Sequence, residues 1–204
     1  MKQSSLFALD SYSYFNPQIL HSFNPLFMRP IIYYVATSLD GYISGPDEDI
    51  SGFVPSGDGV DQYLRDLQDF KVTIMGRKTY EFGYKYGLEP GQPAYAHMEH
   101  YILSDSLKLD NLHPQVKICP VDLSLIKDLK AKSGKPIYLC GGGQFAGWLL
   151  ANELIDILKI KLNPLILGGG VPLFGGTTKQ YQLELLEKQG FEKGLQILTY
   201  QIKY

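Results

Sequence analysis

Three consecutive glycines follow a short apolar run and precede an apolar helical pattern. Residues 137–144 read IYLCGGGQ, and glycines in such a place cost backbone entropy that other residues would avoid. The cost is explained if another group approaches the main chain closely. The start of the following helix offers unpaired N–H groups and a partial positive charge, so Gly141, Gly142, Gly143 and Gln144 form a candidate phosphate or pyrophosphate site. A tight strand-to-helix turn would explain the same glycines without a ligand.

A second group of candidate ligand-binding residues ends another apolar run. Residues 72–79 read VTIMGRKT, which places Gly76, Arg77, Lys78 and Thr79 after a predicted strand. Open α/β sheets bind ligands at the carboxyl ends of their strands. An arginine can bind a phosphate through two parallel hydrogen bonds, and a neighbouring lysine adds a point charge. The alternative is that both cations simply face solvent.

Composition excludes several classes of function. The chain has 204 residues, a net charge of −2 and a pI near 6.1. Its length fits one domain with a substantial core, and its mild acidity argues against a nucleic-acid partner. No run is long enough to span a bilayer. Cys119 and Cys140 give neither metal-site spacing nor a disulfide framework, so we expect a cytoplasmic protein without a metal site.

The first 27 residues differ from the rest. They are rich in Ser, Asn, Tyr and Pro and show no helical or strand periodicity. They also lack the basic start, the continuous apolar stretch and the cleavage site of a secretory signal. We therefore expect residues 1–28 to be a disordered extension, with Met28 as a possible natural start, and residues 29–204 to form one domain.

From residue 30 onward, strand and helix patterns alternate. Helical crossovers between early strands imply parallel pairing, whereas two final strands joined by a short turn must be antiparallel. The prediction is a three-layer α/β domain with a mixed, mostly parallel sheet and a C-terminal antiparallel hairpin. The predicted strands are 30–37, 71–75, 101–103, 116–119, 136–140, 155–162, 182–188 and 194–204. The predicted helices are 58–70, a segment from an N-cap at Asp122 to a stop at Gly134, and 144–151.

The order of four strand-end motifs resembles the dihydrofolate reductase superfold. The motifs are VATSLDG at 35–41, IMGRKT at 74–79, ILS at 102–104 and CGGGQ at 140–144. Within that superfold the chain is most similar to the reductase domain of bacterial riboflavin biosynthesis. The segment 158–174, LKIKLNPLILGGGVPLF, is especially like that branch. The resemblance covers about residues 30–204.

The resemblance implies NADPH as the hydride donor. By position, Gly76, Arg77, Lys78 and Thr79 would hold the adenosine phosphates, and the two cations would favour NADPH over NADH. Leu103 and Ser104 would line the adenine ribose, and Gly141, Gly142, Gly143 and Gln144 would lie beneath the pyrophosphate. Ala36 and Thr37 would contact the nicotinamide through main-chain groups. The protein would position and polarise the reactants, while the cofactor supplies the hydride chemistry.

The resemblance gives two candidate catalytic residues. A dihydrofolate reductase carries a substrate-binding carboxylate on the helix before the second long strand, and Asp61 lies on the corresponding predicted helix. Its alternative is a solvated acid in the first helical turn, and the nearby Asp58 is explained as the helix N-cap. Asp40 could be a polar contact near the nicotinamide or a turn aspartate that bonds its own backbone.

The resemblance implies a small planar heterocycle as substrate, such as a pterin or a ribityl-pyrimidine. The riboflavin-pathway reductases carry an Asp-Asp-Pro segment where this chain has residues 80–87, and the chain lacks the deaminase domain. The aromatic residues Tyr80, Phe82, Tyr84, Tyr86 and Tyr95 could stack on such a ring or only pack together. Two other classes stay open, a non-catalytic NADP-binding protein and a dimeric interaction module. We also expect a homodimer through the C-terminal strands.

Overall fold

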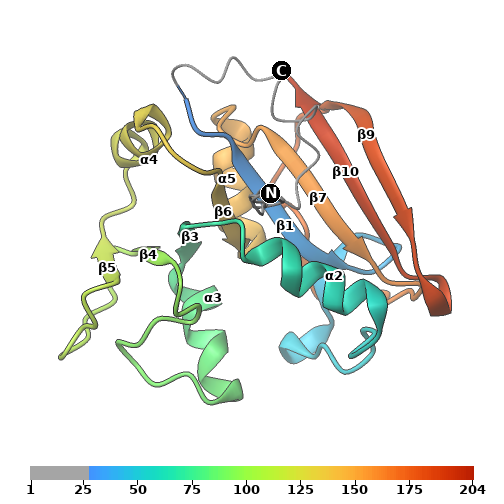
Figure 1. The fold of residues 1–204 in the computed structure, drawn as a ribbon, viewed down its shortest axis with the longest axis horizontal. Coiled ribbons are helices and arrows are strands. Elements are labelled where there is room, and N and C mark those ends of the chain that lie inside the picture. The colour runs from blue at the N-terminus through green and yellow to red at the C-terminus, as the bar shows by residue number, and fades with distance from the viewer. Residues whose placement is uncertain (1–27) are drawn as a thin grey trace, which may run out of the picture.

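A twisted eight-stranded sheet is the centre of the molecule (Figure 1), in the order β5-β4-β3-β6-β1-β7-β10-β9. The computed structural model describes residues 28–204, so the predicted N-terminal extension lies outside the described residues. The strands are β1 (Ile31–Thr37), β3 (Val72–Gly76), β4 (Glu99–Leu103), β5 (Val116–Cys119), β6 (Ile137–Gly141), β7 (Ile157–Leu162), β9 (Gln182–Gly190) and β10 (Gln196–Lys203).

The ladder pattern confirms the predicted mixed sheet. The six strands from β5 to β7 are parallel, β10 is antiparallel to β7, and β9 is antiparallel to β10. Parallel neighbours need a crossover, which the helices supply. All parallel strands therefore end at one edge of the sheet, and the glycine-rich end of β6 lies between the ends of β3 and β1.

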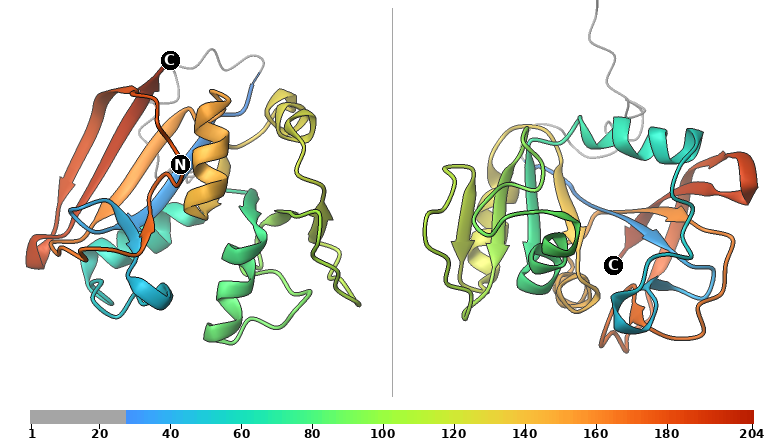
Figure 2. Two further views of the ribbon diagram at one scale, coloured as in Figure 1. Left: turned by 180° about the vertical axis from the view of Figure 1, so that it is seen from behind. Right: turned by 90° about the horizontal axis from the view of Figure 1, so that it is seen from below.

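Helices cover both faces of the sheet (Figure 2). On one face α2 (Asp58–Leu67) packs over a cluster that includes Ile32, Tyr34 and Phe70. On the other face α4 (Leu123–Ala131) and α5 (Gly143–Ala151) pack over the side chains that alternate with these along the strands. This alternation is the period-two pattern expected of strands buried on both sides.

Two local features add to the sequence prediction and two differ from it. Residues after Gly76 form α3 (Arg77–Phe82) and the 3-10 helix η2 (Gly83–Tyr86). A small second sheet pairs β2 (Tyr42–Ser44) with β8 (Val171–Pro172). The prediction of Asp58 as an N-cap is wrong, because the N-cap of α2 is Gly57 and it makes no side-chain cap bond. The helix α4 ends three residues before Gly134, although its predicted N-cap Asp122 accepts the N–H of Ser124 at 2.8 Å.

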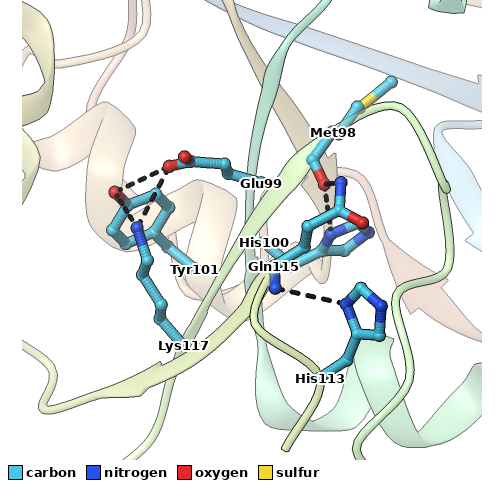
Figure 3. A network of polar contacts seen from close by, with 7 residues as sticks. All are labelled: Met98, Glu99, His100, Tyr101, His113, Gln115 and Lys117. Carbon is cyan, nitrogen blue, oxygen red and sulfur yellow. Dashed lines mark hydrogen bonds and ion pairs between the residues drawn. The ribbon is translucent and has the colours of Figure 1, made fainter.

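A polar network joins β4 and β5 at one end of the sheet (Figure 3). His100 is fully buried, its Nδ1 lies 3.0 Å from the carbonyl oxygen of Met98, and its Nε2 accepts the N–H of Tyr95 at 3.1 Å. Together these bonds select the neutral ring with its proton on Nδ1. Burial lowers the pKa of His100 from 6.5 to about 4.

The buried imidazole of His100 predicts that the protein loses stability in mild acid. Below pH 6.5 the unfolded chain binds a proton at His100, whereas the folded protein does not until about pH 4. The free energy of unfolding should therefore fall as the pH decreases through this window, by up to about 1.4 kcal/mol per pH unit from this group. Urea denaturation between pH 4 and 7 measures the slope. The matched variant His100→Gln should show a shallower slope, and equal slopes in the two proteins would contradict the assignment.

Candidate functional site

Strands β1 and β6 separate before they reach the carboxyl edge of the sheet. Their pairing runs only from Ile31 with Ile137 to Tyr33 with Leu139, whereas β1 pairs with β7 as far as Thr37. In the described ladders, the last residues of β1 therefore have no strand partner on the β6 side. Their main-chain groups border an opening in the sheet, which is rare because buried backbone groups are normally paired.

A bulge in β6 produces this separation. Ile74 pairs with Leu139 and Met75 with Gly141, so Cys140 is the extra residue. The following glycines have left-handed backbone angles, φ +129° at Gly141 and +93° at Gly142, which other residues rarely adopt. Bulges commonly redirect a strand beside a binding site. Here the bulge turns β6 out of the ladder and into the start of α5.

The starts of α3 and α5 meet at this edge. A Cβ atom added at Gly142 would lie 2.7 Å from Oγ1 of Thr79, which shows how closely the two helix starts approach. The first N–H groups of a helix have no intrahelical partner and favour anions. The structure thus brings together two predicted groups, Gly76 to Thr79 and Gly141 to Gln144.

At Gly143 and Gly147, close contacts within the chain itself explain why glycine is present. A Cβ atom at Gly143 would lie 2.0 Å from the carbonyl oxygen of Pro172, and one at Gly147 would lie 2.3 Å from that of Gly175. The N–H of Gly175 also donates to the carbonyl of Gly143 at 2.9 Å. The chain itself, rather than a ligand, makes the close approach at Gly143. The ligand hypothesis therefore depends on Gly141, Gly142 and the helix start.

Arg77 and Lys78 are both exposed in the first turn of α3. The guanidinium Nη1 of Arg77 lies 3.4 Å from Oε1 of Glu81, one turn further along the helix. Such a surface pair contributes little stability, so an incoming phosphate could displace Glu81 at small cost. The two cations lie at the carboxyl edge of the sheet, as predicted.

The other predicted cofactor residues have partners of their own. The Oγ of Ser104 accepts the N–H groups of Ser106 and Leu107 at 3.2 and 2.9 Å, and Leu103 is buried. The carbonyl of Thr37 accepts both the N–H of Asn163, at 2.8 Å, and its side-chain amide, at 3.3 Å. Ala36 is half-buried beside this carbonyl. Main-chain groups free for a ligand are thus on the β6 side of β1.

Asp40 ties a distant loop to the end of β1. Its carboxylate accepts the hydroxyl of Ser38 at 2.6 Å and the N–H groups of Leu167 and Gly168 at 3.1 and 2.7 Å. The hydrogen bond from Ser38 is the largest cause that lowers the pKa of Asp40, to about 2. These bonds favour the turn role of Asp40 over a catalytic role and extend that role to the loop 165–170.

Asp61 lies exposed in the first turn of α2, together with Asp58, which agrees with the solvated alternative. The predicted aromatic group divides into separate contacts. Tyr80 is buried and packs edge-on against Tyr84, with ring centroids 5.6 Å apart. Tyr95 lies apart from them, with its ring stacked on that of His100. This division favours packing over a single stacking surface.

Tyrosine hydroxyls gather beneath α2 beside the bulge. The hydroxyls of Tyr63 and Tyr138 are 2.9 Å apart, and that of Tyr95 lies 3.6 Å from Sγ of Cys140. Burial raises the pKa of all four groups, so they are protonated at neutral pH. Cys140 is accordingly a neutral thiol rather than a nucleophilic thiolate.

Sequence reasoning missed the charged residues under α2. Lys159 and Lys161 alternate with apolar residues in β7 and point to one face, where both are buried. The Nζ of Lys159 lies 2.7 Å from Oδ2 of Asp66, which also accepts the hydroxyl of Tyr34 at 3.0 Å. The available signal was two lysines at positions i and i+2 of a strand that is buried on both sides.

A family model described as the RibD C-terminal domain matches residues 29–197. The Bacillus subtilis (strain 168) uncharacterized protein YwjB is 28% identical over 170 residues, covering 83% of this chain and 96% of that protein. Among the described residues, no helix is long and apolar enough to cross a membrane.

Solved structures share the fold. A candidate riboflavin biosynthesis protein from Shewanella sp. PV-4 superposes with a TM-score of 0.73 at 27% identity, covering 86% of this chain and 99% of that one. A Thermotoga maritima protein, named as a diaminohydroxyphosphoribosylaminopyrimidine deaminase and 5-amino-6-(5-phosphoribosylamino)uracil reductase, gives 0.62 at 13% identity. The match covers 85% of this chain but only 56% of the Thermotoga maritima protein. The similarity is therefore to the fold of one part of that protein.

The contacts of Asp40 predict that Asp40→Asn loosens the loop 165–170. Loss of the carboxylate charge weakens its hydrogen bonds, so amide exchange in this loop should become about five- to ten-fold faster at neutral pH. Hydrogen–deuterium exchange with mass spectrometry measures the change. The variant Asp122→Asn removes a similar carboxylate cap elsewhere and should leave the loop unaffected. Unchanged exchange in Asp40→Asn would contradict the tethering role.

Proposed function

We propose that this chain, which belongs to the RibD C-terminal domain family, is an NADPH-dependent reductase that transfers hydride to a small planar heterocycle. The observation that carries this proposal is the opening between β1 and β6. It has unpaired main-chain groups on one side and the glycines of β6 on the other. Two exposed cations, Arg77 and Lys78, lie at the same edge.

The residues at this edge fit the parts of a dinucleotide. Gly141, Gly142 and the start of α5 would hold the pyrophosphate, because bare amides and the helix dipole favour an anion. Arg77 and Lys78 would bind the 2′-phosphate of the adenosine, with Gly76 and Thr79 beside them. Leu103 and Ser104 would border the adenine ribose. When bound, the cofactor supplies the hydride.

The nicotinamide would lie at the end of β1, against the main chain of Ala36 and Thr37. There the chain positions the ring rather than reacting with it. Loop 165–170, held by Asp40, and the segment 171–176, which starts with β8 and is held on α5, would limit the access of water from the other side. Asp61 is kept as a proposed substrate ligand, although its exposure favours a solvated role.

The acceptor that we favour is a pyrimidine or pterin. The printed name of the Thermotoga maritima protein includes a uracil reductase activity, and a candidate riboflavin biosynthesis protein shares most of this fold. Residues 80–87 form the end of α3 and η2 here, in place of the Asp-Asp-Pro segment expected of riboflavin-pathway reductases. The acceptor can therefore differ from the pathway intermediate.

Two experiments test the function. Quenching of protein fluorescence on titration with NADPH distinguishes a nucleotide-binding protein from an interaction module, which would show no saturable binding. Oxidation of NADPH with pterin, ribityl-pyrimidine, flavin or quinone acceptors then distinguishes an enzyme from a non-catalytic NADP-binding protein. Absence of turnover with every acceptor, together with tight NADPH binding, would favour the non-catalytic alternative.

Removal of the guanidinium in Arg77→Ala should weaken NADPH about ten- to a hundred-fold and NADH far less. A charge-assisted hydrogen bond contributes roughly 1.5–3 kcal/mol, and only NADPH carries the 2′-phosphate. Dissociation constants for both cofactors give the comparison. Lys85→Ala is the control, since Lys85 is an exposed cation paired with Glu48. Equal losses for NADPH and NADH would mean that Arg77 does not recognise the 2′-phosphate.

We also propose that the protein is a homodimer through β9. This strand ends the sheet, and its Leu183 and Leu185 expose 45% and 52% of their surface. A long edge strand that exposes apolar side chains favours pairing with another chain. Light scattering after size exclusion should give about twice 22.9 kDa, and Leu185→Lys should give a monomer. A monomeric wild-type protein would contradict this proposal.

A further inference from the structure

Two lysines of β7 share one face of the sheet but have different partners. Lys159 is 2% exposed and forms an ion pair with Asp66, and its ammonium also lies 4.8 Å from the centroid of the Tyr34 ring. Lys161 is 8% exposed, and its ammonium lies 5.3 Å from the centroid of the Tyr63 ring. No carboxylate among the described residues forms an ion pair with Lys161.

A buried cation without an anionic partner costs stability. Burial disfavours the charged form and lowers the pKa of Lys161, with no charge partner to raise it. The ring of Tyr63 compensates only in part, because a cation–π contact is weaker than a buried ion pair. Its ammonium is not among the fully enclosed polar atoms without a partner in the described residues, so it keeps slight contact with solvent. Lys161 therefore lies at the boundary of the core rather than deep inside it.

Lys161 lies beside the proposed nicotinamide position. Lys161 is the register partner of Ala36 in the parallel pair of β7 and β1, and paired residues point to the same face. Neighbouring strands are about 4.8 Å apart. Tyr63 of α2 lies over the ammonium, and Asn163 bonds the carbonyl of Lys161 at 3.1 Å. A planar group placed beside Ala36 on the α2 face would thus meet both the tyrosine ring and the ammonium.

We propose that Lys161 is a substrate-binding residue whose ammonium pairs with a negatively charged oxygen on the heterocyclic acceptor. This inference rests on the proposed reductase function and adds to it the charge of the acceptor. The bound anion supplies the partner that the protein lacks. Residues retained at the expense of stability are typical of binding sites.

The first test measures ligand charge preference in the protein saturated with NADP⁺. Orotate is the probe, a planar pyrimidine with a carboxylate, and uracil is its uncharged counterpart. By isothermal titration calorimetry, orotate should bind the wild-type protein more tightly than uracil. Lys161→Met should weaken orotate at least ten-fold with little effect on uracil or NADP⁺, and Lys161→Arg should keep part of the preference. Equal binding of both probes, no saturable orotate binding, or unchanged orotate binding in Lys161→Met would overturn the inference.

The second test needs no substrate. Lys161→Met removes an unpaired charge and should raise the melting temperature of the ligand-free protein by about 2–4 °C. The matched control Lys159→Met leaves Asp66 buried without its ammonium and should lower the melting temperature. A fall in the melting temperature of Lys161→Met would overturn the inference by showing a structural partner. If NADP⁺ does not bind the wild-type protein, the reductase proposal fails, whereas the melting result still tests Lys161.

Discussion

The candidate site depends on the separation of β1 from β6 before the carboxyl edge of the sheet. A sheet normally pairs its strands to their ends, because each unpaired buried amide or carbonyl costs free energy. Here the bulge at Cys140 and the left-handed glycines after it end the ladder early. Neighbouring elements maintain the opening. On the β7 side of β1, Asn163 donates to the carbonyl of Thr37, and the segment 171–176 fixes the start of α5. The last residues of β1 are thus left without a strand partner on the β6 side, between elements that are fixed in place, as a ligand site requires.

The face under α2 has unusual chemistry for a core. An apolar strand carries two buried lysines, one neutralised by Asp66 and one facing only an aromatic ring. The hydroxyls of Tyr63 and Tyr138 lie nearby with the neutral thiol of Cys140. If an acceptor binds on this face, as we propose, the unpaired ammonium of Lys161 would let the protein distinguish acceptors by charge as well as by shape.

Sequence patterns predicted the sheet well because its strands are short apolar runs bounded by glycine and proline. They did not predict α3, because residues 77–82 were considered only as candidate ligand-binding and aromatic residues and the helix is only six residues long. The glycine pattern indicated a close approach to the main chain but could not identify the approaching group. At Gly143 that group is the chain's own Pro172, and at Gly142 an added Cβ atom would meet Thr79. The roles of Asp40 and Lys161 depend on partners up to 128 residues away, which local spacing cannot reveal.

The contact between Gly175 and Gly143 also has a consequence for synthesis of the protein. The start of α5 is completed by a segment that leaves the ribosome 32 residues later, after β7 has been made. Closing a loop of this length costs entropy only weakly dependent on its size, so the contact forms readily once both segments are present. Until then Gly143 lacks this partner. A nascent chain truncated before residue 171 therefore cannot complete the start of α5, even though β1, β3 and β6 have already been made.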